Sequence, residues 1–231
     1  MSNPLNDLVN LFYPNLCLLC GQPLVRNERF FCLFCHCTLP KTNYHFNKGN
    51  PAWDLFAGFT PVNEVTSYLF FERQGKTQQL IHALKYYGHK ELAAYLGRMA
   101  AQELKKDGFY ASVDVLLPIP LHPKKEKKRG YNQSAWIAQG FTDVYGCLPE
   151  TQRIKRITDT QSQTQKSIFD RHVNVENIFT VTDPDYFVGK HILLIDDVLT
   201  TGATISSCIE ALWTIPDVTI SIFTLSIARD Y

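Results

Sequence analysis

Four apolar stretches along the chain have the length and the bounding residues of buried strands. They span 64–72, 113–120, 192–195 and 218–228. Between them, apolar residues recur at near-helical spacing over 77–104, with a break at Gly88, over 132–141, and from Thr201 onward. Strands that alternate with helices predict an α/β fold, with a mostly parallel, doubly wound sheet flanked by helices.

The first 60 residues do not follow this alternation. Residues 1–40 contain two cysteine-rich knuckles joined by a short polar link, and residues 41–60 are polar and then aromatic, as in a linker. We therefore divide the chain into a small module over 1–45 and the α/β domain over 46–231.

Composition narrows the class of protein. The chain has 231 residues, of which 45% are hydrophobic and 19% charged, so a substantial core is expected and disorder is not. The formal net charge is only +1, so any basic surface must be local. The apolar runs are too short to insert into a membrane, and the first residues lack the features of a signal peptide. We expect a soluble, cytoplasmic protein.

Five of the seven cysteines fall within 17–37. Cys17 and Cys20 are separated by two residues, as are Cys32 and Cys35, and such paired knuckles can supply the four thiolates of a closed, structural Zn²⁺ site. Disulfides are the less favoured alternative in a cytosolic chain. His36 and Cys37 stay open as substitute ligands.

The segment "ILLIDDVLTTGAT" (192–204) carries candidate chemistry at the carboxyl end of a predicted strand, where open α/β sheets bind ligands. Asp196 and Asp197 suit diol hydroxyls or a divalent cation. The loop that follows enters a helix, whose first N–H groups suit a phosphate. Its residues are Thr200, Thr201, Gly202, Ala203 and Thr204. A simple helix cap explains one of these residues but not the whole set. The implied ligand is a sugar phosphate.

A basic run follows the strand at 113–120. It contains Lys124, Lys125, Lys127, Lys128 and Arg129, opposed by Glu126 alone. On a loop at the end of a strand, such side chains can neutralise a departing pyrophosphate, with Arg129 as the main candidate and Lys128 beside it. A merely solvated charge run is the alternative.

The segment 192–204 resembles the 5-phosphoribosyl-1-pyrophosphate (PRPP) motif of type I phosphoribosyltransferases. The resemblance implies that Asp196 and Asp197 hold the ribose hydroxyls, that Thr200–Thr204 hold the 5′-phosphate, and that Mg²⁺ accompanies PRPP. A polar stretch at 156–179 looks like a flexible hood over the site.

Taken in order, the cysteine knuckles, "LPIPLHP", "RGYNQS", "TQSQT", "RHVNVENIF" and "IDDVLTTGAT" resemble the ComF family over nearly the whole chain. This implies a zinc-ribbon-like module joined to a type I phosphoribosyltransferase domain, in relatives linked to DNA uptake in natural transformation. The resemblance also places a Lys–Tyr segment like "LKYYGHK" (84–90) near the site, although helical packing explains its tyrosines equally well.

Two functions stay open from the sequence. The first is a Mg²⁺-dependent phosphoribosyltransferase that uses PRPP, with an unknown acceptor and no identified general base. The second is a non-catalytic adaptor of DNA uptake that binds single-stranded nucleic acid and retains the PRPP fold. In that case the basic residues would track phosphates, with aromatic side chains nearby for stacking. These residues are Lys124–Arg129, Arg153, Lys155 and Arg156, with Tyr131 and Trp136.

Overall fold

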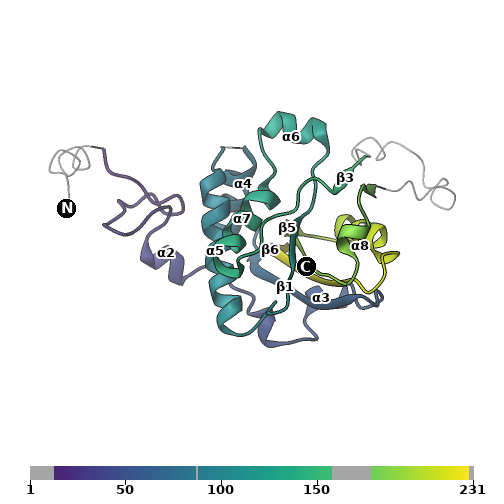
Figure 1. Cartoon of the computed structure of the whole chain (residues 1–231). Coiled ribbons are helices and arrows are strands. Elements are labelled where there is room, and N and C mark those ends of the chain that lie inside the picture. Colours follow the sequence, from purple (N-terminus) through teal and green to yellow (C-terminus); the bar gives the residue numbers. More distant parts are fainter. Residues whose placement is uncertain (1–12, 87, 158–177, 229–231) are drawn as a thin grey trace, which may run out of the picture.

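The computed structural model describes residues 13–86, 88–157 and 178–228 of the chain. Figure 1 shows how the elements are arranged. In chain order they are α2 (Leu33–Cys37), η1 (Tyr44–Phe46), α3 (Pro51–Asp54), β1 (Val62–Phe71), α4 (Lys76–Tyr86), α5 (Lys90–Lys106), β2 (Val115–Pro118), α6 (Pro123–Arg129), α7 (Gln133–Tyr145), β3 (Ile154–Arg156), β4 (Phe179–Val181), η4 (Asp185–Phe187), β5 (His191–Leu199), α8 (Ala203–Trp213) and β6 (Thr219–Ala228).

The main sheet has four strands in the order β1-β6-β5-β2, and every neighbouring pair is parallel. Leu194 of β5 lies between Leu117 of β2 and Ile222 of β6, and all three are fully buried. Helices on both faces explain why these strands read as continuous apolar runs. The predicted α/β fold with a parallel sheet is confirmed.

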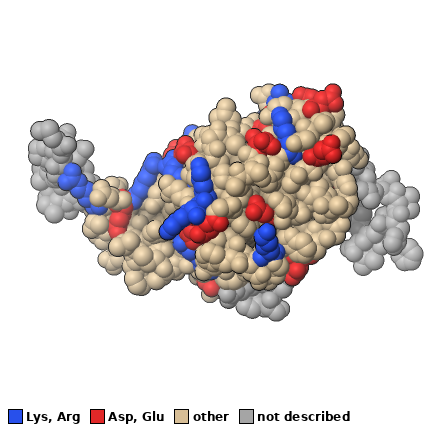
Figure 2. Space-filling model, turned by 60° about the horizontal axis from the view of Figure 1, so that its bottom comes forward, with Lys and Arg blue, Asp and Glu red and all other residues tan. Residues whose placement is uncertain are grey.

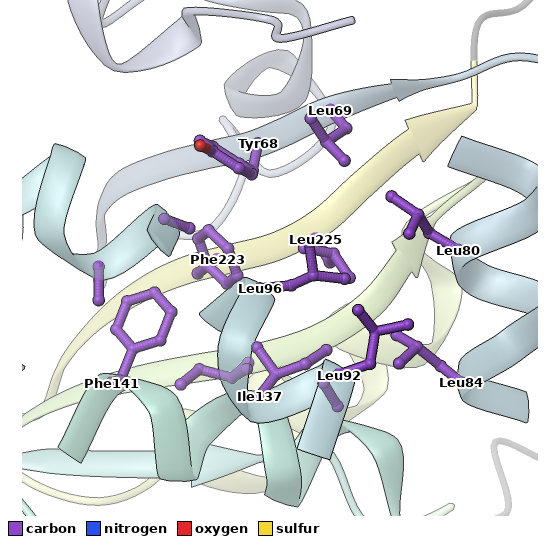
Figure 3. Packing of buried hydrophobic residues seen from close by; sticks show 14 of the residues in the cluster. Tyr68, Leu69, Leu80, Leu84, Leu92, Leu96, Ile137, Phe141, Phe223 and Leu225 are labelled. Carbon is purple, nitrogen blue, oxygen red and sulfur yellow. The ribbon is translucent and has the colours of Figure 1, made fainter. Parts of the chain in front are cut away.

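The core has two parts, one on each face of the sheet. On one face the apolar residues of α4, α5 and α7 pack against the strands, and on the other face α8 and α3 do so. Figure 3 shows the first part, in which Leu96, Ile137 and Phe141 lie against Phe223 and Leu225 of β6. The Phe141 and Phe223 ring centroids are 4.7 Å apart.

Helices α5 and α7 approach each other closely because glycine stands at both contact points. A Cβ added at Gly97 would lie 2.2 Å from the carbonyl oxygen of Ile137, and one at Gly140 would lie 2.2 Å from that of Ala94. Contacts this short are not tolerated between non-bonded atoms, so no larger residue fits without moving a helix.

The structure differs from the sequence prediction over 41–60, which is not a free linker. The segment first pairs with the edge of β1, where Thr42 N donates to Tyr68 O at 3.0 Å. Asn50 then caps α3, and its side-chain amide donates to Val65 O at 2.9 Å. Phe56 is fully buried against the second part of the core. This stretch has too few apolar residues to show a helical or strand period, so the hydrophobic pattern of the sequence does not predict that they are buried.

The basic run after β2 is the helix α6 rather than the expected loop. Pro123 occupies its first turn and Gly130 ends it at φ +82°, as proline and glycine commonly do at helix ends. The predicted hood lies mostly outside the described residues; its two flanks meet in the antiparallel pair β3–β4. No helix in the described part of the chain is long and apolar enough to cross a membrane.

Candidate functional site

Two helices hold the acid pair at the end of β5. The Ser134 hydroxyl of α7 donates to Asp196 Oδ1 at 2.9 Å. The Lys85 ammonium, at the end of α4, lies 3.1 Å from Asp197 Oδ2. Asp196 Oδ1 also accepts from the backbone N–H of Asp197 at 2.9 Å, which fixes its orientation.

The electrostatics of the pair favour a positively charged or hydrogen-donating ligand. Burial, and then the neighbouring carboxylate of Asp197, raise the pKa of Asp196 to about 7, although the Asp197 amide, Ser134 and Lys85 act in the other direction. Two carboxylates that resist joint ionisation gain from a divalent cation or from hydroxyl donors placed between them.

The threonine-rich loop follows the acids after two further residues of β5, Val198 and Leu199. Gly202 caps α8 at φ +76°, and a Cβ there would lie 3.1 Å from Cζ of Phe56, so the loop rests on a buried aromatic ring. A hollow of about 40 Å³ is lined by Asp196 and the residues from Val198 to Ile205. The first N–H groups of α8 come from this loop, which therefore suits a small anion.

The "RGYNQS" segment connects these parts. The Tyr131 hydroxyl donates to the carbonyl oxygen of Leu84, the residue before Lys85. The Asn132 side chain donates to Ile119 O at 3.0 Å and accepts from Ser134 N at 3.0 Å. This segment thus fixes the end of α4 and the start of α7 beside the end of β2.

The structure brings the two acids and the loop together, and the described contacts of the basic candidates do not include the acids. Arg129 donates to Gln133 Oε1 at 2.9 Å, and Lys128 is exposed on α6. Within the described residues, neither forms an ion pair with the acid pair. The cation beside the acids is Lys85, which the helical pattern alone does not distinguish from a packing position. Ser134 lies within the motif "RGYNQS", and that motif was the sequence signal that could have identified it as a site residue.

A second candidate site is a metal centre in the cysteine module. The Sγ atoms of Cys17, Cys20, Cys32 and Cys35 all lie within 4.8 Å of one another, and those of Cys20 and Cys32 are 3.7 Å apart. Four thiolates about 2.3 Å from a tetrahedral Zn²⁺ lie about 3.8 Å from each other, so this set fits zinc. Cys37 and His36 are not part of the group.

The local backbone explains how the sulfur atoms converge. Gly21, at φ +72°, closes the first knuckle with a hydrogen bond from its N–H to Cys17 O at 2.9 Å. Burial opposes ionisation of Cys17, but N–H groups led by that of Cys32 outweigh it and lower the pKa to about 6. Phe31 of the module packs against Tyr95 of α5, and their ring centroids are 5.5 Å apart.

The fold and these sites define an α/β protein with an acid pair and a threonine-rich loop at one strand end and a four-cysteine cluster near its N-terminus. No protein-family model matches the chain. The chain is 28% identical over 222 residues to the DNA utilization protein YhgH of Salmonella typhimurium, which covers 87% of this chain and 92% of that protein.

Two further relatives carry competence names. Competence protein F of Haemophilus influenzae is 26% identical over 160 residues, 69% of this chain and 66% of that protein. Competence protein ComFC of Bacillus subtilis is 37% identical over 93 residues, 39% of this chain and 35% of that protein. The chain is thus similar to proteins named for DNA utilization and for competence, ComFC among them, in line with the resemblance noted in the sequence.

Among solved structures, one match is the allosteric regulatory enzyme of purine biosynthesis. The sequence identity is 21%, the TM-score is 0.38, and the match covers 56% of this chain and 25% of that one. A similarity at this level says nothing about activity.

Proposed function

We propose that the chain binds PRPP with Mg²⁺ and acts as a phosphoribosyltransferase. The observation that supports this most is the meeting of the acid pair and the threonine-rich loop at one strand end. The 5′-phosphate would occupy the small hollow lined by Thr200–Thr204, and the ribose hydroxyls would lie against Asp196 and Asp197. The acids beside the loop favour a sugar phosphate over a lone phosphate. Ribose hydroxyls can donate to carboxylates, whereas two carboxylates would repel a phosphate.

In this proposal the protein contributes position and charge. Bond breaking at the ribose leaves positive charge on the ring and negative charge on pyrophosphate, and both are stabilised by groups already in place. The acid pair faces the ribose, and Lys128 and Arg129 on α6 are the candidates for pyrophosphate. Asp196 and Asp197 could also hold Mg²⁺, which would supply positive charge to offset the charge of the departing pyrophosphate. Zn²⁺ on Cys17, Cys20, Cys32 and Cys35 would be structural, since four thiolates leave no open position.

We further propose that this activity serves DNA uptake or use. The relatives named for DNA utilization and competence support that setting. We take residues 1–45 as the zinc-ribbon-like module and residues 46–231 as the domain that binds PRPP.

Calorimetry with PRPP and Mg²⁺ tests the proposal. Asp197→Asn and Asp196→Asn should each weaken PRPP binding about ten- to a hundredfold, because a hydrogen bond to a charged group contributes about 1.5–3 kcal/mol. Asp185→Asn, an exposed acid on η4, is the matched control. An unchanged dissociation constant in both site variants would contradict the assignment. A pyrophosphate-release assay then separates turnover from binding.

The second candidate, a nucleic-acid adaptor without catalysis, is favoured by the charge of α6, where Lys124, Lys127 and Lys128 are exposed. On the face seen in Figure 2, by contrast, basic and acidic side chains are interspersed. If α6 tracks phosphates, Arg129→Ala and Lys125→Ala should weaken single-strand binding equally, flatten its salt dependence and leave PRPP binding unchanged. If α6 serves pyrophosphate, Arg129→Ala should weaken binding of PRPP but not of ribose 5-phosphate.

A further inference from the structure

A hollow of about 430 Å³ lies at the junction of the cysteine module and α4. Leu18 and Leu19, the two residues between Cys17 and Cys20, form one wall, and one side of α4 forms the other. Ligand pockets occur preferentially where two units meet, and this volume is within their usual range of roughly 300–1,000 Å³. Neither the acid pair nor the threonine-rich loop is among the described residues that line it.

Contacts on either side hold the two walls of this hollow together. Lys76, the first residue of α4, donates from its ammonium to Oγ1 of Thr38, the residue that ends the cysteine-bearing helix α2. The same ammonium lies 5.4 Å from the centre of the Phe34 ring. On α5, the ring centroid of Tyr95 is 5.3 Å from that of Phe30. The hollow is therefore bounded by a packed junction.

Helix α4 lines the hollow with polar side chains, although its apolar residues are buried in the core. Gln78, Gln79 and His82 follow one another at helical spacing on this side. Gln78 accepts a hydrogen bond from the backbone N–H of Gln74. Among the described residues, the side-chain amide of Gln79 has no hydrogen-bond partner. Its carbonyl oxygen and its two N–H donors are therefore available to a ligand.

The lining as a whole indicates a neutral, flat ligand. Leu18, Leu19 and Leu80 supply apolar surface, and His82 and His89 supply imidazole rings on which a flat ring can stack. None of the described residues of the lining is Lys, Arg, Asp or Glu, so no fixed charge there favours a charged ligand. A glutamine amide presents a donor beside an acceptor, which matches the ring nitrogen and the amino group at the edge of adenine.

We propose that this hollow is a further ligand site and that it binds a neutral nucleobase with an amino group beside a ring nitrogen, as the free base or the nucleoside. The Gln79 amide accepts from the amino group and donates to the ring nitrogen, and the leucines cover one face of the ring. A nucleic-acid track, by contrast, needs cations along the phosphate backbone. The inference does not depend on PRPP, since Asp196, Asp197 and the threonine-rich loop take no part in it.

Calorimetry on the full chain at pH 8, without PRPP, tests the site with three probes. Adenosine carries the amino group, purine riboside lacks it, and AMP adds a phosphate. Adenosine should bind at least about fivefold more tightly than purine riboside, because a bidentate contact to an adenine edge discriminates by at least that much. AMP should bind no more tightly than adenosine, because the described lining offers no Lys or Arg to its phosphate.

Two variants assign the binding to this hollow. Another hollow, at the strand ends, shares part of the α4 lining, so the variants change Gln79 and Leu18, which do not line it. Gln79→Ala should remove the preference for adenosine over purine riboside. Leu18→Asp should weaken binding of both nucleosides at least about tenfold, because it places a charge in the apolar wall. If Leu18→Asp does not fold, Gln79→Ala, at an exposed position, decides the matter.

Matched controls are Gln152→Ala and Leu148→Asp, at exposed positions outside the hollow, and both should leave nucleoside binding unchanged. The inference is overturned if adenosine does not bind, if purine riboside binds equally well, or if Gln79→Ala keeps the preference. Tighter binding of AMP than of adenosine overturns the neutral ligand. Adenosine binding that Asp197→Asn abolishes and Gln79→Ala leaves intact belongs to the acid pair and also overturns it. PRPP binding is measured separately, so this inference and the proposed function can fail independently.

Discussion

Lys85 places its ammonium nitrogen 3.1 Å from Oδ2 of Asp197, so the acid pair has an internal counter-cation from another helix. Both side chains are largely shielded, at 23% and 13% exposure, which strengthens the interaction relative to a surface pair. A Mg²⁺ ion or a ribose hydroxyl that reaches Asp197 must compete with this ammonium. Lys85 therefore affects both the charge of the site and its access.

We predict that Lys85→Met raises the pKa of Asp196. Lys85 is one of the groups that lower the pKa of Asp196, so its loss should shift the Asp196 titration upward. Carboxyl ¹³C NMR across a pH series measures this directly. Lys85→Arg should restore the wild-type titration, and Lys90→Met is a control outside the site. A titration unchanged in Lys85→Met would show that the ion pair does not form in solution.

We predict that Asp196 makes the free energy of unfolding fall as pH rises. Burial and Asp197 raise its pKa from 3.8 to about 7, so between these values the folded state holds a proton that the unfolded state has lost. Stability from this group is therefore present at low pH and lost through that window, by about 1–4 kcal/mol. Urea unfolding at a series of pH values, compared with Asp196→Asn, isolates the effect. Parallel curves for the two proteins would argue against a raised pKa.

We predict one zinc ion per chain on Cys17, Cys20, Cys32 and Cys35. Cys20→Ser should abolish stoichiometric zinc, whereas Cys37→Ser, which lies outside the group, should retain it. Elemental analysis of protein purified without chelator gives the count, and chelation should unfold the module because its metal binding is folding energy. Less than about half an equivalent, with all four thiols freely titratable, would rule the site out.

We predict that Gly97→Ala and Gly140→Ala each destabilise the protein by about 1–3 kcal/mol. Alanine ordinarily stabilises a helix relative to glycine by about 1 kcal/mol, so the sign is a sharp test of the close contact. Gly58→Ala, where an added Cβ meets nothing within 4 Å, is the control. Chemical unfolding measures all three, and a stabilising effect at Gly97 would mean that α5 and α7 lie farther apart than described.

Much of the fold could be predicted because its signals are local. The buried run before Asp196 and the break at Gly88 are readable from a few neighbouring residues, and the four strands follow from such runs. The burial of Phe56 and the helix over 123–129 were missed for different reasons. Phe56 is buried by long-range contacts, and the basic run of α6 has no apolar period, so only the proline and glycine at its ends indicate a helix.

The site could be predicted only in part. The acids and the loop are contiguous in sequence, so one motif contains them. Lys85 and Ser134 come from distant segments, and their positions depend on tertiary contacts such as the hydrogen bond from Tyr131 to the Leu84 carbonyl. No periodicity within α4 indicates where its last turn will lie. The sequence around Ser134 likewise does not indicate that its hydroxyl will donate to Asp196.

The crossing of α5 and α7 has a consequence for how this sequence can evolve. The atoms that exclude a side chain at Gly97 and Gly140 are backbone atoms, which every amino acid carries. No compensating substitution on the opposite helix can therefore make room, and drift at these two positions is blocked whatever happens around them. A lineage that lost either glycine would have to displace α7 as a whole, and Ser134 would move away from Asp196 with it.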